Sequence, residues 1–163
     1  MTGLHNLARA MAAIGVSLAS TLAWAQTSEP APAEATPPPA RFEALTDGTV
    51  RDNNTGLIWA GKDNDGDVDW AAAQAYCLTL GAGWDLPRID ELQGIHLPGS
   101  TGQNCMGQLT CSITPLIEVS GLTPWSQDAN GPSEAWYLYL ANGEKYAYDI
   151  TNSQGRRALC VRR

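Results

Sequence analysis

Carboxylates alternate along residues 63–69, which read DNDGDVD. The acidic members of this segment are Asp63, Asp65, Asp67 and Asp69. Hard oxygen ligands spaced this closely around a glycine turn are what Ca²⁺ prefers. The EF-hand register fails, because a loop with Gly66 at its sixth position would begin at Gly61 and end at Ala72. Two interpretations stay open: a partial calcium site that takes further ligands from elsewhere, and a solvated acidic turn that leads into a helix.

Tyrosines alternate along two strand-like segments that flank a turn. Residues 135–140 read AWYLYL, Asn142-Gly143 is a strong hairpin signal, and the return segment runs to Ile150. The tyrosines concerned are Tyr137, Tyr139, Tyr146 and Tyr148. Pairing of the two segments would cluster these rings into a flat apolar surface with polar rims, which suits a sugar or another polymer. Ordinary cross-strand packing is the competing interpretation.

Arginines gather near the end of the chain, at Arg156, Arg157, Arg162 and Arg163. We consider Arg156 and Arg157 candidate ligand-binding residues, with charge at a strand edge as the alternative. The whole chain carries a formal net charge of −7. This acidic balance opposes strong attraction of polyanions, and it argues against nucleic acid as a partner.

Catalysis by histidine would depend on His96, because the other of the two histidines lies in the leader described below. A Ser-His-Asp or Cys-His site would have to use this one residue. His96 falls in a stretch rich in Gly and Pro, which favours a surface loop. We therefore predict that the protein is not an enzyme.

The four cysteines, an even number in a chain predicted below to be exported, indicate two disulfides. Sequence alone allows three connectivities. Cys105 and Cys111 are close enough for an easy local bridge, which would leave Cys77 to pair with Cys160. A zinc site is disfavoured, because neither C-x-x-C spacing nor histidine partners are present.

The first 40 of the 163 residues do not look like part of a domain. Residues 1–25 contain an apolar run of about a dozen residues followed by Ala23-Trp24-Ala25, which predicts a cleaved signal peptide. That run is too short to span a bilayer comfortably, so we expect no membrane insertion after cleavage. Residues 26–40 form a linker rich in Pro and Ala. The predicted domain is 41–163, exported to the periplasm or secreted.

The elements that must position these residues are short. Strands are expected at 41–46, 49–51 and 57–60, and a helix capped by Asp69 is expected from Trp70 to Leu80. A second helix is expected at 89–94, followed by an irregular loop over 96–122 and strands at 135–140, 146–150 and 158–161. This order predicts an α+β domain with two short helices, a small antiparallel sheet and two disulfides.

A series of motifs in a specific order resembles the C-terminal domain family of the Legionella collagen-like adhesin, and it covers nearly all of 41–163. The motifs are 55–59 (TGLIW), 70–77 (WAAAQAYC), 83–87 (GWDLP), 91–92 (EL), 125–126 (WS), 135–137 (AWY), 142–143 (NG) and 159–162 (LCVR). The chain departs from the family pattern at Asp85 and Arg88, where the family usually has Arg and Thr. The second helix would thereby lose its Thr cap, although Asp85 could pair with Arg88.

The resemblance implies a C-type-lectin-like fold in an extracellular or periplasmic bacterial protein. It implies a disulfide from the first helix to the last strand, in agreement with Cys77–Cys160, and it suggests binding of sulfated glycans. Neither Glu-Pro-Asn nor Gln-Pro-Asp occurs, so the calcium-dependent sugar site of true C-type lectins is not expected. The chain also has no collagen repeats, so trimerisation by such a stalk is not implied.

We therefore expect an exported, non-catalytic binding module, similar to an adhesin domain, that recognises a polysaccharide or a surface protein, with Ca²⁺ as the one candidate cofactor. The alternative is a structural or accessory envelope protein with a single protein partner and no glycan binding.

Overall fold

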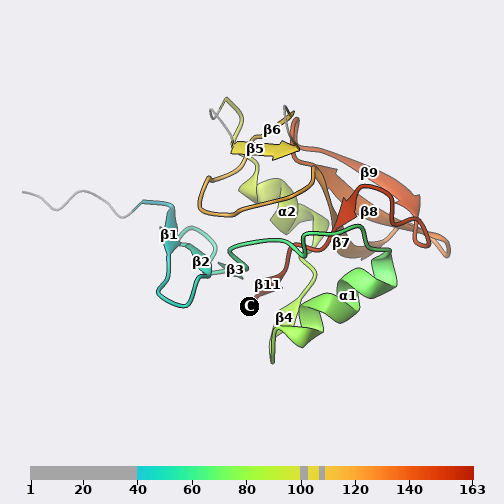
Figure 1. Ribbon diagram of the computed structural model, residues 1–163, viewed down its shortest axis with the longest axis horizontal. Helices are drawn as coiled ribbons and strands as arrows, with labels where there is room; N and C mark the ends of the chain where they lie inside the picture. The colour runs from blue at the N-terminus through green and yellow to red at the C-terminus, as the bar shows by residue number, and fades with distance from the viewer. Residues whose placement is uncertain (1–39, 100–102, 107–108) are drawn as a thin grey trace, which may run out of the picture. The chain divides into compact units, whose positions relative to one another are not determined.

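The computed structural model describes residues 40–99, 103–106 and 109–163. The predicted signal peptide and all but the last residue of the predicted linker lie outside these residues. Within the described part of the chain, none of the helices is long and apolar enough to cross a membrane. The fold is α+β, as expected, with two helices and two main sheets (Figure 1).

The first sheet joins the two ends of the domain. It comprises β1 (Phe42–Ala44), β2 (Val50–Asp52), β3 (Ile58–Trp59), β11 (Val161–Arg162) and β4 (Trp84–Asp85), in that order. All of its pairings are antiparallel. The last strand, β11, therefore lies between β3 and β4 and is paired on both sides (Figure 1).

The second sheet carries the tyrosines. Its order is β10 (Arg156–Arg157), β7 (Thr123–Ala129), β8 (Glu134–Tyr139) and β9 (Glu144–Asp149). The β10–β7 pair is parallel and the other pairs are antiparallel. Sequence patterning missed β7, because TPWSQDA does not alternate in a simple way and its register with β8 is broken by an irregularity.

Helix α1 (Trp70–Thr79) begins as predicted, because the Asp69 carboxylate accepts a hydrogen bond of 2.8 Å from the Ala72 amide. Helix α2 (Ile89–Ile95) lacks the Thr cap, yet its first amides are satisfied from elsewhere. Asp128 on β7 accepts from the Ile89 amide at 2.7 Å. Glu91 accepts from the Arg88 amide, also at 2.7 Å. Arg88 forms its ion pair with Glu91, at 3.3 Å, rather than with Asp85.

Two clusters of buried apolar side chains hold these layers together, and both helices pack against the second sheet (Figure 1). Leu92 and Ile95 of α2 meet Leu138 in one cluster. Ala73 and Cys77 of α1 belong to the other cluster, together with Trp125. Buried apolar side chains of both helices therefore pack against the sheet that carries the tyrosines.

Both disulfides form as predicted. Cys77–Cys160 joins α1 to the segment that leads into β11, with 5.4 Å between the Cα atoms. Cys105–Cys111 joins β5 (Gln103–Met106) to β6 (Leu109–Cys111), which form a small antiparallel sheet of their own. The prediction of an irregular loop over 96–122 was therefore wrong for this hairpin, whose polar residues give little strand signal.

The expected last strand at 158–161 was also misplaced. The backbone there bonds to the segment before α1: the Ala158 amide donates to the Asn64 side chain at 2.7 Å, and the Cys160 carbonyl accepts from the Ala60 amide at 2.9 Å. Regular pairing in β11 begins only at Val161. The apolar residues of this segment correctly predicted that it is buried. They could not show that its Ala158 amide bonds to the Asn64 side chain rather than to a neighbouring strand.

Candidate functional site

The two tyrosine segments pair as an antiparallel hairpin, as the sequence predicted. Tyr137 lies opposite Tyr146, and Ala135 lies opposite Tyr148. Alternate residues of a strand share a face, so Tyr137, Tyr146 and Tyr148 project from one side of β8 and β9. The rings of Tyr137 and Tyr146 are stacked, with centroids 5.8 Å apart and an interplanar angle of 29°.

Arg156 lies against this aromatic group. Its guanidinium carbon is 3.9 Å from the centroid of Tyr137, 4.8 Å from that of Tyr148 and 5.5 Å from that of Trp125. The residue is 9% exposed, and Arg156 makes no salt bridge among the described residues. A guanidinium over several ring faces is held by cation–π attraction. Arg156 therefore supports the tyrosine face from within.

The outer part of this face is open to solvent. Tyr146 is 41% exposed and Tyr148 is 44% exposed, and both belong to β9 at the edge of the sheet. The Tyr146 hydroxyl donates to the Glu144 carboxylate, and this hydrogen bond raises the pKa of Tyr146. We call Tyr137, Tyr146 and Tyr148 the tyrosine face.

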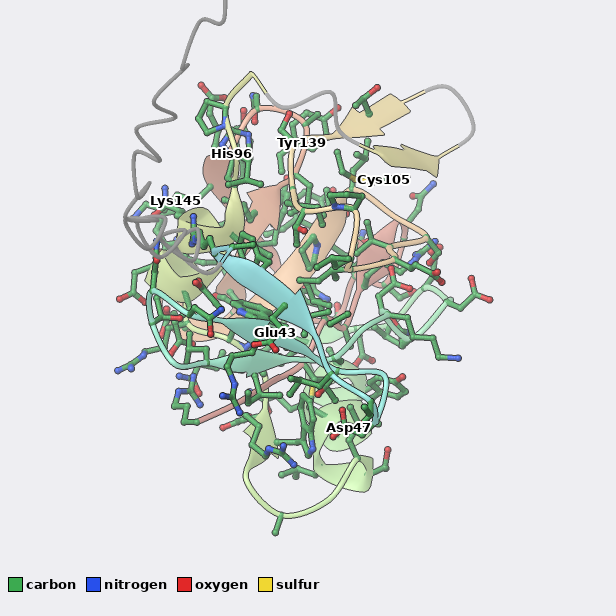
Figure 2. The ribbon with its side chains drawn as sticks, turned by 90° about the vertical axis from the view of Figure 1, so that its left-hand side faces the viewer. Glu43, Asp47, His96, Cys105, Tyr139 and Lys145 are labelled. Carbon is green, nitrogen blue, oxygen red and sulfur yellow. A yellow bond between two sulfur atoms is a disulfide. The ribbon has the colours of Figure 1, made fainter. Side chains whose placement is uncertain are left out.

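Tyr139 does not belong to this exposed group. It shares a side of β8 with Tyr137, but its ring packs against the cluster that contains Leu138, whereas Tyr137 packs against the cluster that contains Trp125. Of the four tyrosines expected to group, three therefore form one cluster. Figure 2 shows Tyr139 and His96 at the same end of the domain, with Asp47 at the opposite end. His96 packs on the hairpin turn, because a Cβ atom on Gly143 would lie 2.5 Å from its Nδ1 atom.

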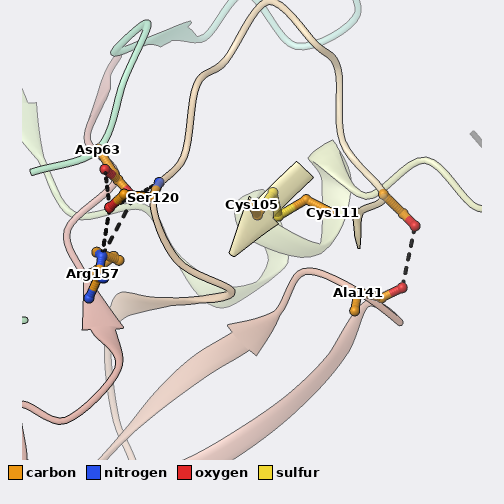
Figure 3. The surroundings of a disulfide bond; sticks show 7 residues. Asp63, Cys105, Cys111, Ser120, Ala141 and Arg157 are labelled. Atoms are coloured by element: carbon orange, nitrogen blue, oxygen red, sulfur yellow. Dashed lines mark hydrogen bonds and ion pairs between the residues drawn. A yellow bond between two sulfur atoms is a disulfide. The ribbon is translucent and has the colours of Figure 1, made fainter. Parts of the chain in front are cut away.

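The segment rich in aspartate is fastened to the rest of the domain by an arginine. Asp63 is buried and accepts from the Ser120 amide at 2.7 Å and from the Ser120 hydroxyl at 3.0 Å (Figure 3). The Nε atom of Arg157 lies 4.0 Å from Asp63 and donates to the Ser120 hydroxyl at 2.8 Å. Arg157 also forms an ion pair with Asp67. A hydrogen bond from the Gly155 backbone and the contact with Arg157 lower the pKa of Asp67.

This arrangement directs the carboxylates to different partners. Asp63 faces Ser120, Asp67 faces Arg157, Asp69 caps α1, and Asp65 is exposed in the left-handed region with φ of 51°. No set of three or more His, Cys, Asp or Glu side chains among the described residues could hold a metal ion. The aspartates as arranged do not fit a shared cation, and calcium binding by this segment is a question for titration.

The four arginines of the predicted basic end are separated by the fold. Arg156 lies among the aromatic rings and Arg157 among the carboxylates, as described above. Arg162 lies over the Trp84 ring at 5.2 Å, and Arg163 is paired with Glu91 at 2.6 Å. Each cation thus has a partner of its own. Arg156 packs under the tyrosine face, and Arg157 holds the segment rich in aspartate against the domain. Their spacing in the sequence did not indicate these roles.

Two surface hollows lie away from the tyrosine face. One has a volume of about 460 Å³ and is bordered by Asp63 and Glu118, and the other has a volume of about 360 Å³ and is bordered by Leu80 and Trp84. Both are lined by Lys62 and Tyr76, so they adjoin. Burial, followed by the charge of Asp63, raises the pKa of Tyr76. Sequence reasoning did not identify this groove, because its lining comes from distant segments.

Comparison with known proteins agrees with the motif order. The model of the family described as the Lcl C-terminal domain matches residues 48–162, which is most of the described domain. No curated protein matches the chain. All four cysteines form disulfides, and this feature together with the family is that of an extracytoplasmic domain. The chain belongs to the Lcl C-terminal domain family.

Proposed function

We propose that this domain is a non-catalytic binding module that recognises a polysaccharide outside the cytoplasm through the tyrosine face. The observation that carries the proposal is the exposure of Tyr146 and Tyr148 on one side of an edge strand that Arg156 and Tyr137 support from behind. Tyrosine offers a rigid, flat apolar face with a polar rim, at little cost in side-chain entropy. Such faces suit the apolar faces of sugar rings.

The charge distribution favours a neutral glycan over a sulfated one. Arg156 is buried, and Arg157 and Arg163 are engaged with carboxylates. The exposed Lys145 projects from the opposite side of β9 to Tyr146 and Tyr148, so little cationic surface is left on the tyrosine face. The net charge of −7 adds a long-range repulsion of polyanions. The sulfated-glycan binding that the family resemblance suggests therefore has less support than binding of an uncharged polymer.

A glycan array tests this proposal. We expect the exported, oxidised protein to retain neutral polysaccharides, and we expect Tyr146→Ala and Tyr148→Ala to lose this retention while their melting temperatures stay near that of the wild type. Leu116→Ala is a matched control, because Leu116 is also 40% exposed but lies outside the tyrosine face. Retention unchanged in both tyrosine variants, or retention of sulfated glycans alone, would contradict the proposal.

A second candidate function is docking of a protein partner in the groove at Lys62 and Tyr76. The observation that favours it is the exposure of Leu78 (66%) and Leu80 (40%) at the end of α1, with Leu80 lining one of the two hollows. Exposed apolar side chains beside a groove are a feature of protein interfaces. On this alternative, Leu80→Asp abolishes cross-linking to a cell-envelope partner and Tyr148→Ala leaves it intact.

A further inference from the structure

Strand β9 is an unpaired edge. It ends the β10-β7-β8-β9 order, and no further strand of the described residues pairs with its outer side. It is six residues long, and five of them are exposed and one half-buried. Regular exposed edges of this kind are templates for another strand, and proteins usually blunt or cover them.

The alternation of backbone hydrogen bonds between β8 and β9 shows which residues of β9 point their N–H and C=O groups away from β8. Opposed residues of an antiparallel pair alternately point their backbone groups toward each other and away. The Ile150 amide donates to the Ser133 carbonyl at 3.0 Å, so even-numbered residues of β9 face β8. The backbone groups of Lys145, Ala147 and Asp149 therefore point away from the sheet. Of these groups, the Asp149 carbonyl is already used, because it accepts from the Asn152 amide at 3.1 Å.

The sequence of the edge is complementary to itself in one register. Two antiparallel copies of β9 whose symmetry axis passes through Ala147 place Lys145 opposite the partner's Asp149 at both ends, and Tyr146 opposite the partner's Tyr148. This register is compatible with the backbone hydrogen bonding, since the N–H and C=O groups of Ala147 point away from the sheet and can bond to those of the partner's Ala147. Moving the axis to Lys145 or to Asp149 would oppose like charges, and moving it to Tyr146 or Tyr148 would leave no charge pair.

The single copy contains a feature that this pairing relieves. Glu134 and Asp149 lie directly opposite each other on β8 and β9, and like charges so placed are unfavourable. In the paired register, the partner's Lys145 lies on the other side of Asp149 and on the same face of the sheet. Lys145 is exposed and lies 5.1 Å over the Trp136 ring, a contact from which a flexible side chain can turn away.

We propose that two copies of this chain associate through β9, in this register, to form one sheet that runs through both domains. The occupant of the edge is thus a second copy, selected by charge complementarity at both ends of the strand. The pairing aligns Tyr146 and Tyr148 of both copies in one row on one face, so the partner extends the tyrosine face. A strand contact of this length is small, so the dimer dissociates readily.

Charge reversal tests the register. In a homodimer, Lys145→Glu places two acidic side chains opposite each other at both ends of the strand pair, and Asp149→Lys places two basic side chains there. In a heterodimer of the two variants, the two substituted positions lie opposite each other at one end, acidic against basic, and the unsubstituted Asp149 and Lys145 lie opposite each other at the other end. Both ends therefore carry opposite charges again. We expect sedimentation equilibrium of the exported, oxidised wild type to show a mass that rises toward the dimer with concentration. Each variant alone should associate roughly tenfold more weakly or worse, and the equimolar mixture should recover the association.

Two controls keep the result interpretable. Arg51→Glu makes the same charge change at an exposed position of the other sheet and should leave association unchanged. Ala147→Pro removes the central backbone amide that points away from the sheet, at an edge position that tolerates proline, so it should abolish association. This variant replaces Asp149→Lys as the test if Asp149→Lys does not fold. A wild type that stays monomeric at every concentration, or a dimer that both single reversals leave intact, overturns the proposal. Neither readout involves a glycan, so failure here is distinct from failure of the proposed function.

Discussion

The guanidinium of Arg156 is stacked on Tyr137, with 3.9 Å between the guanidinium carbon and the ring centroid. This contact joins β10 to β8 across the intervening strand β7, and it fixes the ring on which Tyr146 is stacked. The tyrosine face therefore depends on an arginine that is itself almost fully buried.

Replacement of Arg156 tests this support. Arg156→Ala should lower the free energy of unfolding by about 2–3 kcal/mol, because it leaves a cavity among Trp125, Tyr137 and Tyr148. Arg156→Met keeps much of the packed volume and removes a buried charge, so its cost should be below about 1.5 kcal/mol. Urea denaturation followed by tryptophan fluorescence measures both values. An alanine variant as stable as the wild type would show that the stack contributes little.

The two disulfides should differ in their contribution to stability. Cys77–Cys160 spans 83 positions of the sequence and Cys105–Cys111 spans 6. Loop-closure entropy then predicts losses of roughly 4–5 kcal/mol and roughly 2 kcal/mol when each pair is replaced by alanine. Differential scanning calorimetry of the two double variants gives the ranking. A larger loss from the short bridge would contradict this account of the unfolded state.

Glu91 predicts a loss of stability in acid. Burial raises the pKa of Glu91, but hydrogen bonds from Arg163 and from the Arg88 amide outweigh this effect and leave it lowered. A carboxyl with a lowered pKa stabilises the fold above its unfolded value of about 4.3, and this contribution is lost as the pH falls through the folded pKa. Glu91→Gln should therefore cost about 1–2 kcal/mol at pH 7 and much less near pH 3. A cost independent of pH in urea titrations would refute this assignment.

Calcium titration tests the aspartate segment. Since Arg157 already pairs with Asp67 and lies beside Asp63, Ca²⁺ would have to displace this cation. We expect no saturable heat when millimolar Ca²⁺ is added to the chelator-treated protein, and no change in melting temperature. Saturable binding that is lost in Asp65→Ala and Asp67→Ala would instead establish the site that the alternating carboxylates predict.

Local signals in the sequence were sufficient for much of the fold. The Asp69 cap, the hairpin turn and the pairing of the two segments that flank it follow from spacing over a few residues, and each is confirmed. The placement of Arg156 and Arg157 could not be read in this way. Their partners lie tens of residues away in the chain, and adjacent side chains on a strand point to opposite faces.

The remaining errors have a similar origin. Strand β7 and the β5–β6 hairpin are poor in apolar alternation, and their stability comes from pairing with other strands and from a disulfide. The cap of α2 depends on Asp128, which lies 39 positions away. Tertiary partners of this kind override local propensity, so their positions could not be predicted from spacing.

In the proposed function, Tyr148 and Tyr146 contact a glycan with their ring faces. Titration calorimetry with the best neutral oligosaccharide from the array, comparing Tyr148→Phe with Tyr148→Ala, tests it most directly. Phenylalanine keeps the ring, so its affinity should stay within about threefold of the wild type, whereas alanine should lose roughly tenfold or more. Equal affinities for the wild type and the alanine variant would place the binding surface elsewhere and contradict the account.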